Sequence, residues 1–428
     1  MQILRHALKY IVIFLLVVAL LTMLLVLCAC IPKSAIRENM LESAQYLCEG
    51  ALFGTVVEGV EGSKIDRYAD SILLGIAWQY DSTDPLRSVM LSSYSHTKHQ
   101  NENENLLDAV TENLAPNQQY LRYWHGSNAI VRLLLLVCSM EQIYQLNGIG
   151  MLVLIIWLLA VLCRQKYYIP ACGIGLGLVL TASWFVPLSL EYTWTYLLML
   201  AGAVASVKLA CAGKWQHLGV FFLLSGMLTN YLDFLTTESL TLLVPLLLVL
   251  WIDFHVRRRA MHAMVVDAGK AALAWLFGYG GMWITKWLLA SLVLGENVLP
   301  YVTGHIQQRV GSGGLQLMLS AVVRNVKCLF PLEYGTAGML AAIGIALILM
   351  YVGYVYHKNR INKPWILLLL MIGAVPYIRY MVLSNHAYLH FFFTYRAQMA
   401  AIVALVMILG EVVEWRWLTH GTGRKAKR

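Results

Sequence analysis

Residues 10–31 read YIVIFLLVVALLTMLLVLCACI and decide the fold, because no charged side chain interrupts them. About 20 mostly apolar residues are enough for a helix to cross the hydrocarbon core of a membrane. We therefore predict a transmembrane helix here. Residues 27–30 loosely resemble a lipoprotein cleavage site. The apolar run is longer than a signal-peptide core, however, and we favour an uncleaved anchor.

Similar apolar runs follow along the whole chain. The same criterion predicts an all-α, polytopic transmembrane helix bundle with about ten spans. The expected spans are residues 10–31, 148–163, 168–188, 193–211, 217–231, 240–253, 271–294, 337–356, 365–382 and 397–413.

The composition supports a membrane protein. Of the 428 residues, 59% are hydrophobic and 13% are charged, whereas soluble domains are about 25% charged. The net charge is +9, but the basic residues form short clusters between apolar runs instead of one basic patch. Nucleic acid is therefore not an expected partner.

The basic clusters also predict the orientation of the chain. Lys and Arg are enriched in cytoplasmic loops, and here they follow every second expected span, so both termini are predicted to be cytoplasmic. Short loops without an Asn-x-Ser/Thr site favour a bacterial cell (inner) membrane. The clusters are Arg5 with Lys9, Arg164 with Lys166, Lys208 with Lys214, residues 257–259, Lys358 with Arg360 and Lys363, and residues 416–428.

This topology divides the chain into four parts. Residues 1–31 form the cytoplasmic tip and the first span, and residues 32–147 form a large extracytoplasmic loop with amphipathic interfacial helices. The remaining bundle comprises residues 148–413, and residues 414–428 form a basic cytoplasmic tail. Because of Arg132 and Glu141 we place residues 127–147 at the outer interface. The alternative is a two-span hairpin over residues 124–163.

The large loop contains the acidic motif Asp66-Arg67-Tyr68-Ala69-Asp70. Two carboxylates at positions i and i+4 share one face of a helix. Such a pair can bind a divalent cation such as Mg²⁺ or Mn²⁺, or one member can act as a general base toward an acceptor. The alternative is a solvated acidic helix end.

This motif and the predicted layout resemble the C-type glycosyltransferase superfamily. The string from Asp66 to Asp70 is similar to the acidic Arg-Tyr-Ala-acidic pattern in the first loop of its sugar-transferring members, which use polyprenyl-phosphate sugars as donors. The resemblance implies that Asp70 is the catalytic base and that Asp66 is the second candidate. In this chain the motif lies some thirty residues beyond the first span, and no large soluble domain follows the last span.

An aromatic and basic cluster over residues 120–126 ends the large loop. Its rings can stack on a sugar while Arg122 or His125 contacts phosphate or hydroxyl groups. The alternative is that its Trp and Tyr side chains mark the membrane interface.

Two charged residues, one at a span boundary and one within a span, are further substrate-binding candidates. Asp233 lies at a membrane boundary and Lys286 lies in an otherwise apolar span, where unpaired charges are costly and often functional. The alternative for Lys286 is that it snorkels outward. The alternative for the segment around Asp233 is that Thr236 or Thr237 caps the next helix, with Glu238 in its first turn.

The last outer loop contains His386, His390 and Arg396 and follows Arg379. Two histidines at i and i+4 can bind a metal, but no acidic third ligand accompanies them, so zinc is not favoured. We expect the arginines to bind phosphate, with a histidine adding hydrogen bonds. The alternative is an aromatic interface anchor with snorkelling arginines.

Together these features predict a membrane glycosyltransferase. Its partners would be a lipid-linked sugar donor, an extracytoplasmic acceptor and membrane lipids. Two other classes remain open: a membrane polysaccharide polymerase or ligase, and a transporter or assembly protein without catalysis.

Overall fold

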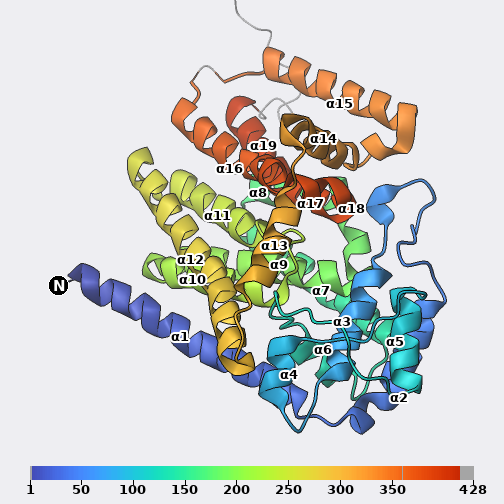
Figure 1. The fold of residues 1–428 in the computed structure, drawn as a ribbon. Coiled ribbons are helices and arrows are strands. Elements are labelled where there is room, and N and C mark those ends of the chain that lie inside the picture. Colours follow the sequence, from blue (N-terminus) through green and yellow to red (C-terminus); the bar gives the residue numbers. More distant parts are fainter. Residues whose placement is uncertain (1, 359, 415–428) are drawn as a thin grey trace, which may run out of the picture.

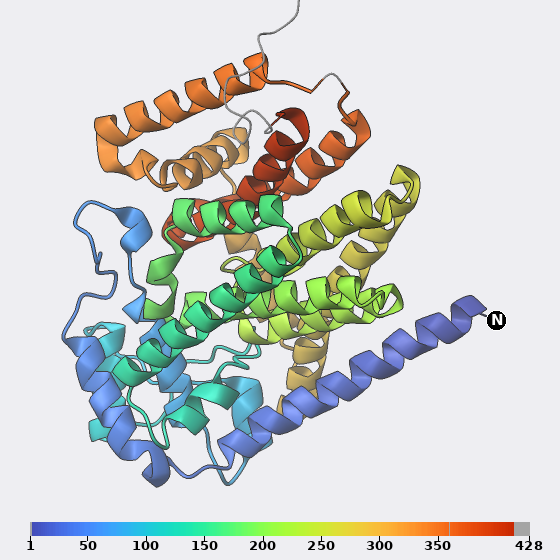
Figure 2. The same ribbon diagram turned by 180° about the vertical axis from the view of Figure 1, so that it is seen from behind.

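The computed structural model describes residues 2–358 and 360–414, with residues 2–7 described by their backbone only. Of the predicted basic tail over residues 414–428, residues 415–428 lie outside this part of the chain. Within the described part every regular element is a helix, as predicted, and only three isolated bridges pair extended residues. Figure 1 shows the arrangement, and Figure 2 shows it from behind.

Seven helical segments of the described chain are long and apolar enough to cross a membrane, so the chain is an integral membrane protein. All seven coincide with expected spans. They are Leu8–Ala29, Met140–Arg164, Leu190–Cys211, Leu240–Arg257, Leu332–Val355, Lys363–Val382 and Phe391–Val412.

The count of about ten spans is not confirmed, because three expected spans are not among the seven. The run over residues 168–188 is broken into α8 (Tyr168–Leu180) and a 3₁₀ segment, with Ala182 at a φ of 44°. A helix of 13 residues such as α8 is only about 20 Å long. The other two are α10 (Leu218–Leu232), which is also short, and α12 (Met261–Leu294), which is long but less apolar because glycines, aromatic residues and Lys286 interrupt its apolar residues.

Five helices form a folded unit between α1 (Gln2–Ala29) and α7 (Met140–Arg164), which we call the α2–α6 unit. Its helices pack into a buried apolar cluster that they share with α1, α7 and helices of the bundle, and the Trp78 indole N–H donates to the carbonyl of Ala109 at 3.0 Å. It lies at one end of the molecule in both views (Figures 1 and 2). Its helices are α2 (Lys33–Cys48), α3 (Arg67–Gln79), α4 (Pro85–Leu91), α5 (Glu102–Thr111) and α6 (Asn128–Leu134).

The segment over residues 127–147 contains two helices. With seven residues, α6 is about 10 Å long and too short to cross a membrane, so the two-span hairpin does not form. Arg132 is buried and donates to the carbonyls of Ile31 and Ala77. Glu141 lies in the first turn of α7, after the Ser139 cap.

The remaining helices form the bundle. Two glycines bring α10 and α12 into close contact, because a Cβ on Gly226 would lie 2.1 Å from the Trp275 carbonyl and one on Gly278 would lie 2.3 Å from the Leu223 carbonyl. The long α15 lies at the edge of the bundle in both views. The other helices are α9 (Leu190–Cys211), α11 (Leu240–Ile252), α13 (Leu299–Val310), α14 (Gly314–Lys327), α15 (Gly335–Val355), α16 (Lys363–Val382), α17 (Ser384–Leu389), α18 (Phe391–Thr394) and α19 (Met399–Val412).

Candidate active site

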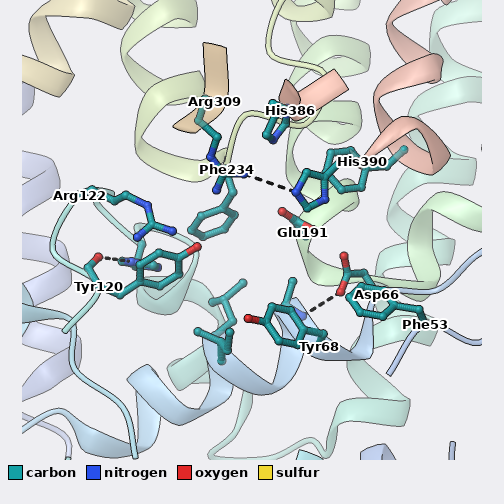
Figure 3. A pocket seen from close by; sticks show the side chains of 15 residues that line it. Phe53, Asp66, Tyr68, Tyr120, Arg122, Glu191, Phe234, Arg309, His386 and His390 are labelled. Carbon is teal, nitrogen blue, oxygen red and sulfur yellow. Dashed lines mark hydrogen bonds between the residues drawn. The ribbon is translucent and has the colours of Figure 1, made fainter. Parts of the chain in front are cut away.

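A cavity of about 270 Å³ lies where the α2–α6 unit meets the bundle. Its walls come from α3, from the segment before α6, from the first turn of α9, and from α13 and α17. Figure 3 shows that the labelled side chains converge on this space from different elements. The polar and aromatic lining residues are Phe53, Asp66, Tyr68, Tyr120, Arg122, His125, Glu191, Phe234, Arg309, His386, His390 and Phe393.

Two carboxyl groups lie side by side in the wall of this cavity. Asp66 caps α3 by accepting a hydrogen bond from the Ala69 N–H at 2.9 Å, and its carboxylate also accepts a hydrogen bond from the Glu191 carboxyl group. A hydrogen bond between two carboxyl groups requires a proton on one of them. Burial raises the pKa of Asp66 to about 6, although the hydrogen bonds oppose this shift. Asp66 is therefore the acceptor in this pair.

Arginines border the same cavity. Arg122 lies 3.9 Å from the ring of Tyr120, and its Nε atom is buried without a hydrogen-bond partner. Arg309 approaches Nε2 of His390 at 3.4 Å. Neither arginine forms an ion pair among the described residues. Their guanidinium groups therefore provide uncompensated positive charge next to the cavity.

His386 and His390 lie one turn apart on the rim formed by α17, with ring centroids separated by 4.8 Å. Burial and the neighbouring arginines lower both pKa values, to about 4 for His390. Both rings are therefore neutral at pH 7, and their Nδ1 atoms are buried without a partner. Neutral imidazole rings can donate hydrogen bonds to an anion without being charged.

His125 closes the cavity beside Tyr120. Its Nε2 lies 2.9 Å from the Tyr120 carbonyl, and burial lowers its pKa to about 3. The neutral ring thus donates through Nε2 and keeps Nδ1 as an acceptor. Tyr120 and Phe234 pack against this ring at 4.9 and 5.2 Å between centroids, so the wall is aromatic.

The structure places Asp70 outside the cavity. Its carboxylate accepts hydrogen bonds from the Tyr144 hydroxyl at 2.5 Å, from the Ser189 hydroxyl at 3.1 Å and from the Leu190 N–H at 3.0 Å. Burial raises its pKa to about 7. Asp70 therefore satisfies the first N–H groups of α9 and holds that helix against α3.

Two arginines expected at the site do not line the cavity and bind other parts of the protein instead. Arg379 forms a buried two-point ion pair with Glu238, with its Nε 2.6 Å from Oε1, and it also donates to the Leu235 carbonyl. Glu238 therefore pairs with Arg379. Arg396 is buried and donates to the carbonyls of Gly62 and Phe392.

Asp233 and Lys286 likewise have internal partners. The Asp233 carboxylate accepts from the Thr195 hydroxyl at 2.7 Å and from Thr236, which fixes the turn between α10 and α11. The Lys286 ammonium donates to the carbonyls of Val89 and Met90, at 2.9 and 3.2 Å, near the end of α4. It is fully buried and does not snorkel.

Five of the ten predicted site residues therefore line one cavity, and the other five stabilise the fold around it. The cavity residues are Asp66, Arg122, His125, His386 and His390. Over residues 2–358 and 360–414, no group of three His, Cys, Asp or Glu side chains is placed to hold a metal ion. The described side chains around the acidic motif therefore do not fit the divalent cation that the motif suggested.

Sequence reasoning missed Glu191 and Arg309. Glu191 is an acidic residue in the first turn of an apolar helix. Carboxylates are common there because they stabilise the helix dipole, so the sequence gives no sign that Glu191 lies next to Asp66. Arg309 lies at the end of α13, two residues before Gly311 at φ 78°. Only the tertiary fold brings it to His390.

Comparison with known proteins adds no relative. No protein-family model matches this chain, and neither a curated protein nor a solved structure matches it.

Proposed function

We propose that the protein is a membrane glycosyltransferase that moves a sugar from a polyprenyl-phosphate carrier to an acceptor on the extracytoplasmic face. The observation that carries this proposal is the cavity itself, in which a pair of adjacent carboxyl groups, two guanidinium groups without an ion-pair partner and neutral imidazole rings line the same space. Transfer from a phosphate-linked sugar needs both kinds of group.

The carboxyl pair supplies the base, and we assign this role to Asp66 in place of Asp70. The acceptor hydroxyl gives its proton to the Asp66 carboxylate while its oxygen bonds to the anomeric carbon. The bond from that carbon to the phosphate oxygen breaks, and the polyprenyl phosphate leaves with the electron pair. A pKa near 6 leaves Asp66 largely ionised at pH 7 and makes it a stronger base than an exposed carboxylate.

The arginines stabilise the leaving phosphate. Negative charge develops on its oxygens as the bond breaks, and guanidinium groups bind such oxygens through paired hydrogen bonds. Arg122 and Arg309 are suited to this role because neither is neutralised by a described carboxylate, whereas Arg379 is. His386 and His390 can add neutral N–H donors.

The aromatic wall supports a sugar as the transferred group. Tyr68, Tyr120 and Phe234 line the cavity, and aromatic faces pack against the apolar C–H surface of a sugar ring while polar groups bind its hydroxyls. The cavity lies next to α9 and α17, beside segments that can cross a membrane, which favours a donor held in the lipid. Following the Lys/Arg pattern, we propose a bacterial inner membrane location with both termini cytoplasmic.

A transfer assay tests this proposal. The purified protein is reconstituted into lipid vesicles with a panel of polyprenyl-phosphate sugars, and release of polyprenyl phosphate is followed by mass spectrometry. Asp66→Asn should abolish release, because Asn can still cap α3 but cannot accept the proton. The matched control Asp81→Asn changes an exposed acid of the same unit and should keep full activity.

Two results would contradict the proposal. Wild-type protein that releases polyprenyl phosphate from no member of the panel would contradict the reaction class. Full activity in Asp66→Asn would contradict the assignment of the base.

A further inference from the structure

A second cavity, of about 340 Å³, lies at the other end of α10. Leu218, the first residue of α10, lines this second cavity, whereas Phe234, just after its last turn, lines the first. Residues from α1, α11 and α12 complete its walls. The basic cluster over residues 257–259 lies here, at the end of the bundle that the Lys/Arg pattern predicts to be cytoplasmic.

The mouth of this cavity holds three cations and two carboxylates. Arg257 and Arg259 both pair with Asp253, at 2.9 and 3.3 Å, and Arg259 also pairs with Asp267 at 2.7 Å. Lys270 lies 3.3 Å from Asp267 and is exposed. The ion pairs hold the guanidinium groups in place, and the group keeps one excess positive charge.

The rest of the cavity is apolar. Phe222, Leu246 and Ala271 line it below the charged mouth, and the Arg257 guanidinium stacks on Trp215 at 4.0 Å. Tryptophan is enriched at the membrane–water interface. The cavity is therefore amphipathic, with positive charge at one end and an apolar wall at the other.

We infer that this cavity binds an anionic phospholipid, with the phosphate group at Arg257, Arg259 and Lys270 and an acyl chain along the apolar wall. Basic pockets between transmembrane helices on the cytoplasmic side bind the head groups of such lipids. The excess positive charge favours an anion, and the apolar wall favours a hydrocarbon chain. The inference is independent of the reaction at the first cavity.

Lipid binding to the purified full-length protein tests the inference. Native mass spectrometry measures the binding of phosphatidylglycerol, of phosphatidylcholine and of the soluble head-group mimic glycerol phosphate. Phosphatidylglycerol should bind in preference to the other two, and more weakly as salt is raised. Lys270→Gln should weaken its binding about fivefold, the effect of one cation near an anionic head group. Ala271→Leu should weaken binding by filling the apolar part.

The matched control is Lys214→Gln, which removes an exposed charge next to Trp215 but outside the cavity lining, and it should bind like the wild type. Equal binding of both lipids, or unchanged phosphatidylglycerol binding in Lys270→Gln, would overturn the inference. Glycerol phosphate that binds as tightly as the lipid would overturn the role of the acyl chain. Because Lys270 is exposed, Lys270→Gln should fold. It therefore decides the test even if Ala271→Leu fails to fold.

Discussion

Replacing Arg379 by Met removes one side of an ion pair that lies in the interior of the protein. The Arg379 and Glu238 side chains are only 8% and 9% exposed, and two hydrogen bonds of 2.6 and 3.0 Å join them. In Arg379→Met the Glu238 carboxylate stays buried without its cation. We expect this variant to be strongly destabilised.

The expected loss follows from the geometry. Breaking a buried ion pair by removing one partner costs about 3–5 kcal/mol, because an uncompensated charge remains. The Leu235 carbonyl also loses the guanidinium as a donor, which adds about 1 kcal/mol. Changing both residues to Met removes the stranded charge, so the double variant should recover all but about 1 kcal/mol of the loss.

Thermal unfolding of the purified proteins in detergent measures the effect, at one scan rate because membrane proteins often unfold irreversibly. Arg379→Met should unfold well below the wild type, and the Arg379→Met, Glu238→Met variant should unfold close to it. A double variant that is less stable than either single variant would refute the reasoning. A single variant with wild-type stability but a raised KM for the donor would return Arg379 to the phosphate-binding role that the sequence suggested.

Three further outcomes are expected. The value of kcat/KM should fall about tenfold per pH unit below about pH 6, because Asp66 with its raised pKa must be ionised to act as a base; a pH–rate profile that stays flat down to pH 5 would contradict this. Arg309→Gln should lower kcat/KM for the donor about 10- to 150-fold, the effect of a charged hydrogen bond to the leaving phosphate, with the unfolding temperature unchanged. Lys286→Met should lower the free energy of unfolding by about 1–3 kcal/mol, because it leaves the Val89 and Met90 carbonyls unpaired. The KM of the folded protein should stay the same. A changed KM at unchanged stability would argue against a structural role.

The sequence was sufficient to predict the all-helical class and the long apolar helices. Helices such as α1 and α16 are recognisable because their apolar runs are as long as a membrane is thick. The same criterion failed for residues 168–188, because Ala182 adopts a positive φ and interrupts the helix although no Gly stands at the break. Hydropathy does not report such a local change in backbone conformation.

Only part of the candidate site was predictable from the sequence, because side-chain partners depend on the tertiary fold. Sequence identifies buried charges but does not show whether they bind a ligand or another part of the protein. Arg379 stands in an apolar run and was selected as a ligand, yet Glu238 neutralises it. Arg309 stands in a polar stretch and was not selected, yet it lines the cavity. The same ambiguity applies to Asp66 and Asp70, whose roles depend on the start of α9, more than a hundred residues away.

The central claim is that the first cavity holds a polyprenyl-phosphate sugar between Asp66 and the arginines. A cryo-electron microscopy structure of the purified protein with an unreactive polyprenyl-phosphonate sugar tests it most directly. The claim predicts density for the phosphonate at Arg122 and Arg309, with the anomeric carbon facing Asp66. An empty cavity with the lipid head group bound elsewhere on the protein would contradict it.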